Sequence, residues 1–225
     1  MLLKKSGIYI GIIVLIGCLI MAWIDAILMP NYAVKSAIKL VLFILLPLIY
    51  AKSNKQVSLR DLFILKPKAF LYSLMLGFIV YISILGAYFL LGPYFDFSNI
   101  TKTLENNIGV NKSNFVFVAI YISIINSFLE EFFFRGFAFL TLKRVTSRKF
   151  AYIFSATAFS LYHVAIMTNW FTPGLFILLI ASLFFSGLLF NWLNEKSGTI
   201  YSSWLVHMCA NLAINTVGFM LFEIL

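Results

Sequence analysis

Two adjacent glutamates and an arginine interrupt a strongly apolar stretch of the chain, SFLEEFFFR at residues 127–135. An ionised carboxylate is costly in such surroundings unless a partner holds it. Glu131 and Arg135 are four residues apart, in the order that favours an ion pair along one helix. Glu130 points about 100° away from Glu131 around the same helix and therefore needs a partner from elsewhere in the chain.

The chain has two histidines, and both lie in apolar segments. His163 follows Phe159 by four residues, and His207 precedes Asn211 by four residues, so each pair shares one face of a helix. A single buried histidine is more often a packed, hydrogen-bonded residue than a functional one. Ionisable residues inside a membrane segment are nevertheless candidates for function, and these two are candidate partners of Glu130.

The composition places these residues in a membrane protein. The chain has 225 residues, of which 62% are hydrophobic and 11% are charged, with a mean hydropathy of +0.99. Soluble domains have roughly 45–50% apolar and about 25% charged residues. The net charge of +9 comes from short basic loops and does not indicate nucleic-acid binding. We expect a multi-pass protein of the cell membrane, with the lipid bilayer as its surroundings.

The apolar segments predict an all-α, polytopic transmembrane helix bundle of about seven spans, with six or eight as alternatives. The expected spans are residues 7–29, 33–51, 69–91, 113–142, 150–167, 175–193 and 199–222. The first could be read as a signal peptide, but apolar sequence continues after Cys18, so an uncleaved span is the better interpretation. Loops rich in Lys and Arg alternate with loops of balanced charge, which predicts a cytoplasmic N-terminus.

Glu130, His163 and His207 are expected at similar depths in the membrane. They lie 13, 14 and 11 residues from the basic end of their own helices, which corresponds to depths of about 19, 21 and 16 Å. Independent placement in a hydrocarbon core about 30 Å thick would usually scatter them more widely. We therefore predict that these residues and Asn211 surround one water-accessible cavity.

A carboxylate and two imidazoles around a buried water suggest hydrolysis. Glu130 could take a proton from the water, and an imidazole could orient the water or pass the proton on. The remaining histidine and the amide of Asn211 could donate to a developing oxyanion. Alternatively, Glu130, His163 and His207 could bind zinc and leave one position open for water. No cofactor is needed in the first mechanism, whereas zinc is the cofactor in the second.

Three motifs in this order resemble the CPBP family, which comprises type II CAAX prenyl proteases and abortive-infection-like or bacteriocin-processing intramembrane proteases. They are E-E-x-x-x-R at residues 130–135, F-x-x-x-H at residues 159–163 and H-x-x-x-N at residues 207–211. The first three spans carry no signature of the family. A further family pattern, F-x-x-G-x-x-x-G, fits Phe184 and Gly187 but has Asn191 at its second glycine, and a polar Asn191 could join the site.

The resemblance implies an intramembrane endopeptidase with a single membrane domain over residues 1–225 and a catalytic helical core over residues 113–222. The family's roles would make Glu130 and His163 the groups that activate water, and His207 and Asn211 the groups that stabilise the oxyanion. Glu131, Arg135 and Phe159 would support the site. The substrate would be a membrane-associated peptide or protein, such as a pheromone or a bacteriocin leader.

Two other interpretations remain open from the sequence. Glu130, His163, His207 and Asn211 form a polar layer whose sole role could be to hold helices together, in a non-enzymatic bacteriocin-immunity or scaffolding protein. Interhelical hydrogen bonds do stabilise membrane bundles modestly. Buried Glu and His residues also occur in transporters and proton relays, but those folds predict repeated halves, and the sequence has none. The ordered set of motifs favours the protease.

Overall fold

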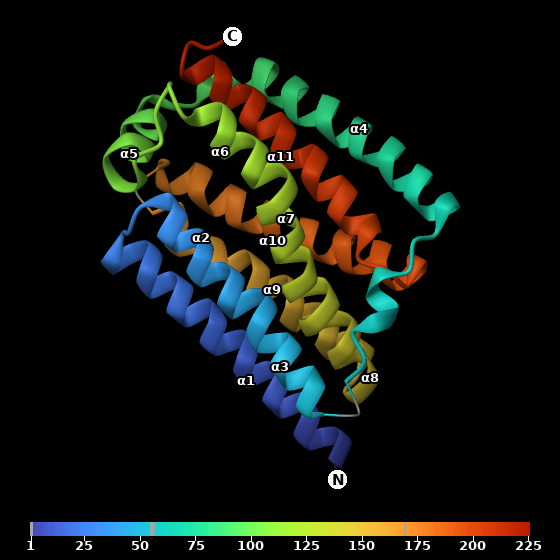
Figure 1. The fold of residues 1–225 in the computed structure, drawn as a ribbon. Coiled ribbons are helices and arrows are strands. Elements are labelled where there is room, and N and C mark those ends of the chain that lie inside the picture. The colour runs from blue at the N-terminus through green and yellow to red at the C-terminus, as the bar shows by residue number, and fades with distance from the viewer. Residues whose placement is uncertain (1, 55–56, 169) are drawn as a thin grey trace.

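The computed structural model describes residues 2–54, 57–168 and 170–225, which form helices joined by short loops (Figure 1). The helical segments, with π-helical and 3₁₀ pieces labelled η, are α1 (Leu2–Trp23), η1 (Ile24–Leu28), α2 (Tyr32–Leu40), η2 (Val41–Leu45), α3 (Leu46–Ser53), η3 (Arg60–Phe63), α4 (Pro67–Leu91), η4 (Gly92–Tyr94), α5 (Ser98–Ile108), α6 (Phe115–Tyr121), η5 (Ile122–Asn126), α7 (Ser127–Glu130), η6 (Glu131–Thr141), α8 (Leu142–Val145), α9 (Arg148–Ile166), α10 (Pro173–Ser197) and α11 (Tyr201–Leu221).

The fold is an all-α bundle of membrane-spanning helices, as predicted. Within the described residues, six continuous helices are long and apolar enough to cross a membrane. They correspond to all the expected spans except residues 150–167. That segment forms α9, a helix of 19 residues that packs against α10, η6 and α1. Because α9 carries two serines, a threonine and a histidine, its sequence is less apolar than that of the other spans, although its length still permits a seventh crossing.

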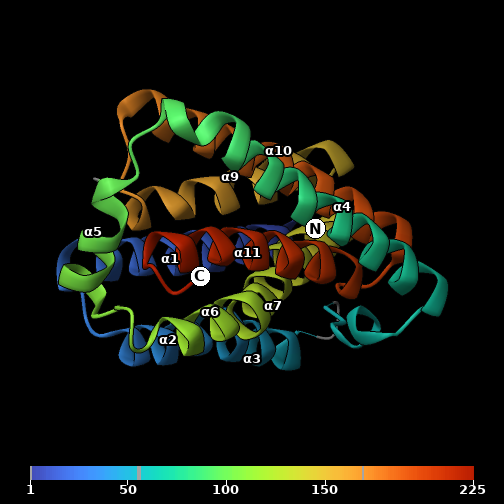
Figure 2. The ribbon, with the colours of Figure 1, turned by 90° about the horizontal axis from the view of Figure 1, so that it is seen from above.

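The spans run up and down between two ends of the bundle, so the N- and C-termini lie at opposite ends (Figure 1). The end that holds the N-terminus gathers the basic loops. There Lys143 and Arg148 contact Glu195, and Arg144 contacts Asp61. The other end carries α5, the start of α10 and the C-terminus, as the view from above also shows (Figure 2).

Phenylalanine packing forms the centre of the bundle. Phe133, Phe134 and Phe137 are completely buried, and Phe43 of η2 stacks on Phe133 with ring centroids 4.1 Å apart. Many large apolar side chains on α1, α4 and α10 are exposed instead, including Leu19. In a membrane protein such side chains face lipid, so the run of phenylalanines beside the two glutamates belongs to the protein core.

The polar segment between the third and fourth spans, residues 92–112, contains the helix α5. The left-handed residue Gly109 ends this helix, and the amide of Gly109 donates to the carbonyl of Glu105. The polar composition of the segment concealed a short amphipathic helix, because a loop and the solvated face of a helix have similar residue types.

α9 and α10 approach each other closely where the family pattern has its glycines. A Cβ atom at Gly187 would lie 3.0 Å from the Cα of Ala156. One turn further along α10, the amide nitrogen of Asn191 donates to the carbonyl of Tyr152, and its oxygen accepts from Ser155. Asn191 therefore joins two helices and does not line the cavity described below, contrary to the suggestion that it could belong to the site.

Replacing Gly187 with leucine should destabilise the bundle by about 1–3 kcal/mol, because the side chain would collide with the backbone of α9. Gly86→Leu is the matched control, since Gly86 also lies in the interior of a helix but a Cβ atom there would meet no other atom within 4 Å. Thermal unfolding of the two variants in the same detergent measures the difference. Equal unfolding temperatures would contradict the close contact.

Candidate active site

Two π-helical segments lie on either side of the helical turn that ends at Glu130, and the second of them contains Glu131. η5 ends at Asn126, α7 supplies one turn that ends at Glu130, and η6 begins at Glu131. π-helical turns are uncommon and occur often at functional sites. All residues of η6 are buried, so this part of the chain runs through the middle of the protein with no face toward lipid.

Glu130 has its partner in the second span. Its Oε1 accepts from the Nζ of Lys39 at 2.6 Å and from the Nδ2 of Asn126 at 3.0 Å. Glu130 is 2% exposed and Lys39 is 5% exposed, so the ion pair is buried. The ammonium group of Lys39 also lies 5.0 Å from the ring centroid of Tyr162. These contacts offset the free-energy cost of burying the Glu130 carboxylate. The two hydrogen bonds both involve Oε1, so Oε2 is left available to other groups.

Both imidazoles converge on the free oxygen of Glu130. The Nε2 atoms of His163 and His207 each lie 3.8 Å from Oε2. The Nδ1 of His163 lies 2.8 Å from the carbonyl oxygen of Phe159. Because a carbonyl can only accept, this Nδ1 donates, and the neutral ring therefore carries its lone pair on Nε2.

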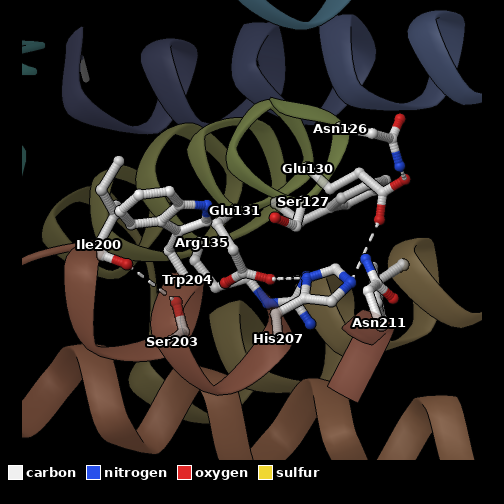
Figure 3. A network of polar contacts seen from close by, with 12 residues as sticks. Asn126, Ser127, Glu130, Glu131, Arg135, Ile200, Ser203, Trp204, His207 and Asn211 are labelled. Atoms are coloured by element: carbon white, nitrogen blue, oxygen red, sulfur yellow. Dashed lines mark hydrogen bonds and ion pairs between the residues drawn. The ribbon is translucent and has the colours of Figure 1, made fainter. Parts of the chain in front are cut away.

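Glu131 orients the second imidazole. Its Oε1 lies 2.8 Å from the Nδ1 of His207, and an ionised carboxylate accepts the hydrogen bond from that ring (Figure 3). The expected ion pair with Arg135 is present, with Nη1 3.2 Å from the same oxygen. The guanidinium group also lies 3.8 Å from the ring centroid of Phe159, which holds it by a cation–π contact.

Asn211 comes from the same face of α11 as His207 (Figure 3). Its Nδ2 donates to the carbonyl of Ile122, the first residue of η5, at 3.2 Å. An amide nitrogen has two hydrogens, so this bond fixes the side chain and leaves a second donor. Asn211 lines the same cavity as Glu130, His163 and His207.

The four candidate residues share a cavity of about 340 Å³. Apolar side chains such as Ile122, Ile166 and Ile214 form much of its wall, and Tyr162 also contributes. The hydroxyl of Tyr162 has no hydrogen-bond partner among the described residues. A mainly apolar cavity with a few convergent polar groups has the character of a ligand site.

The donor set does not fit the zinc alternative. Among the residues that the structure describes, no group of three or more His, Cys, Asp or Glu side chains is arranged to hold a metal ion. The ammonium of Lys39 already occupies one oxygen of Glu130 and would repel a nearby cation. Glu131 is likewise engaged by His207 and Arg135.

Lys39 is the member of the site that the sequence analysis missed. The motifs lie in later spans, and α2 carries no family signature. A signal was present, because a lysine inside an apolar helix needs a partner as much as a glutamate does. The nearby Asp25 offered another partner for it, but Asp25 pairs with Lys35 in the structure. Helix periodicity alone does not decide between these pairings.

Replacing Lys39 with methionine should reduce the free energy of unfolding by about 3–5 kcal/mol, because it leaves Glu130 buried without its cation. The double variant Lys39→Met/Glu130→Gln should recover most of this loss. Thermal unfolding in detergent of the wild type, the two single variants and the double variant gives the coupling. Additive losses would show that the two side chains do not depend on each other.

The comparisons with known proteins point to the same part of the chain as the motifs. Residues 112–213 match the family model described as Type II CAAX prenyl endopeptidase Rce1-like. No curated protein and no solved structure matches the chain. The matched residues contain all three motifs that resemble the CPBP family. Residues 112–213 are therefore similar to the type II CAAX prenyl endopeptidases, and this match supports the resemblance of the chain to the CPBP family of membrane-embedded proteases.

Proposed function

We propose that the protein is an intramembrane endopeptidase in which Glu130 activates a water molecule for attack on a peptide bond. The observation that carries this proposal is the convergence of two imidazole Nε2 atoms, each 3.8 Å away, on the Oε2 of a buried glutamate. This separation is too long for a direct hydrogen bond but suits a water molecule that bonds to the carboxylate and an imidazole together.

In this mechanism the ion pair with Lys39 keeps Glu130 ionised and turns Oε2 toward the cavity. Oε2 removes a proton from the water, while the Nε2 lone pair of His163 accepts a hydrogen bond from the water's other hydrogen. The water oxygen then attacks the carbonyl carbon of the substrate. General-base catalysis of this kind requires a hydrogen-bonded water and a base in its ionised form.

His207 and Asn211 supply the donors for the oxyanion. Glu131 accepts from Nδ1 of His207 and stabilises the imidazolium, which can then donate from Nε2. The second amide hydrogen of Asn211 is the other donor. Donors that are held in place before the reaction stabilise developing negative charge strongly in a site that excludes water.

The tetrahedral intermediate collapses when the bond between its carbon and the substrate nitrogen breaks. Glu130 returns the proton it took from water to the leaving nitrogen, so the products are a carboxylic acid and an amine. Arg135 and Phe159 are positioning residues, because Arg135 pairs with Glu131 and the carbonyl of Phe159 orients His163. We propose a membrane-associated peptide or protein as the substrate, such as a pheromone or bacteriocin leader.

Glu130→Gln, His163→Ala and His207→Ala should each reduce proteolysis about a hundredfold or more, because the first two remove groups that take up or orient a proton of the water and the third removes a donor to the oxyanion. Cells that express the wild type should contain membrane peptides with new N-termini, and sequencing of N-terminal peptides should find them missing with the three variants.

Glu105→Gln is the matched control for Glu130→Gln, because Glu105 is an exposed residue of α5 and undergoes the same chemical change. It should preserve the cleavage products. All variants should insert into the membrane at wild-type levels. Loss of insertion together with loss of cleavage would indicate that the polar layer only pairs helices.

Chelation should leave the activity of the purified protein unchanged, since the proposed mechanism uses no metal. The measurement is the cleavage rate of a peptide identified in the cellular experiment, before and after treatment with a strong chelator, together with the metal content of the protein. Activity lost on chelation and restored by zinc would replace the glutamate mechanism with the metal mechanism.

A further inference from the structure

The charges of the protein are distributed very unequally between its two ends. One end consists of residues 4–5, 52, 60–68, 143–149 and 195–196, and it carries eleven of the 17 Lys and Arg residues but two of the eight acidic residues. The opposite end, within the described residues, carries three basic and four acidic residues. In multi-pass membrane proteins the loops with the excess of Lys and Arg face the cytoplasm.

The cavity leads away from the basic end. Glu130 and His207 lie at its inner part, and its other lining residues include Met29 and Tyr32 between α1 and α2, Thr103 of α5, and Thr168 after α9. These segments belong to the end that also holds the C-terminus (Figure 1). Met29 is 46% exposed, and Thr168 is exposed as well.

We propose that the cavity opens on the extracytoplasmic side of the membrane and admits an apolar peptide segment from that side. The charge asymmetry fixes the orientation, and the positions of the lining residues fix the side of the opening. The claim that this segment is a substrate rests on the proposed peptidase function. The claim about the side on which the cavity opens is independent of that function. The natural substrates would then be segments exposed outside the cytoplasm, and a cytoplasmic C-terminus could not reach Glu130.

The wall of the cavity determines which segments fit. The apolar and aromatic lining of the cavity includes Tyr32, Ile166, Met167 and Trp170, with Ile214 on α11. A peptide that passes these side chains exchanges contact with lipid or water for contact with apolar protein surface. The charged residues that line the cavity form two ion pairs, Asp25 with Lys35 and Glu130 with Lys39, so the lining carries no net charge from these four residues.

Cysteine labelling in intact cells tests the orientation without any need for proteolysis. The probe is a negatively charged, membrane-impermeant methanethiosulfonate. Thr168→Cys places a thiol at the opening, and Ser36→Cys places one inside the cavity, about one turn of α2 before Lys39. Ser58→Cys places one at the exposed surface of the basic end, and Ser155→Cys buries one between helices away from the cavity.

We expect Thr168→Cys and Ser36→Cys to be modified to the same extent in intact and in permeabilised cells. Ser58→Cys should be modified about tenfold less in intact cells and fully only after permeabilisation, as expected for a cytoplasmic site. Ser155→Cys and the wild type, whose Cys18 and Cys209 are partly or wholly buried, give the background. Labelling of Ser58→Cys in intact cells, or of Ser36→Cys only after permeabilisation, would overturn the proposal.

A second readout separates this proposal from the proposed function. Modification of Ser36→Cys from outside should block formation of the new N-termini that the wild type generates, because the adduct fills the route to Glu130. If the outside thiols are labelled but no cleavage occurs in any cell, the orientation stands and the peptidase assignment fails. If cleavage continues after full modification of Ser36→Cys, the substrate uses another route and the proposal fails.

Discussion

Burial of two ionised carboxylates on consecutive residues is the constraint on which the rest of the site depends. Glu130 and Glu131 are 2% and 0% exposed, in the middle of a bundle that is surrounded by lipid. Each carboxylate therefore needs its own compensation. Lys39 from α2 provides it for one, and Arg135 with His207 provides it for the other. Three separate spans are tied together by these requirements.

The division of partners gives the two glutamates different chemistry. Glu131 contacts both His207 and Arg135 through Oε1, its buried Oε2 has no hydrogen-bond partner among the described residues, and the contact with His207 orients that imidazole. Glu130 is held through one oxygen and presents the other to two imidazoles and a cavity. A carboxylate base that is held through one oxygen and free at the other suits proton transfer. Because the base is already in position, no free energy is spent on reorganising it during the reaction.

The sequence alone determined the class of protein, the approximate spans and the identity of most candidate residues. Composition and apolar run length suffice for the first two, because a membrane requires about 20 apolar residues for each helical crossing. Glu130, His163, His207 and Asn211 could be selected because ionisable and polar side chains are conspicuous in apolar helices. Their similar depths could be predicted from the rise of a helix, which is a local property.

The tertiary structure alone decided which side chains meet. From the sequence, Lys39 could be paired with Asp25 or with a distant glutamate. In the structure α2 and α7 are placed so that Lys39 pairs with Glu130. The hydrogen bond from His163 to Phe159 and that from His207 to Glu131 select the ring nitrogens that face the cavity. Asn191, which could have joined the site, binds α9 instead. These outcomes depend on the rotation of each helix and on how closely the helices approach one another. Both are set by the packing of many side chains from different helices, and the sequence pattern of a single helix does not contain that information.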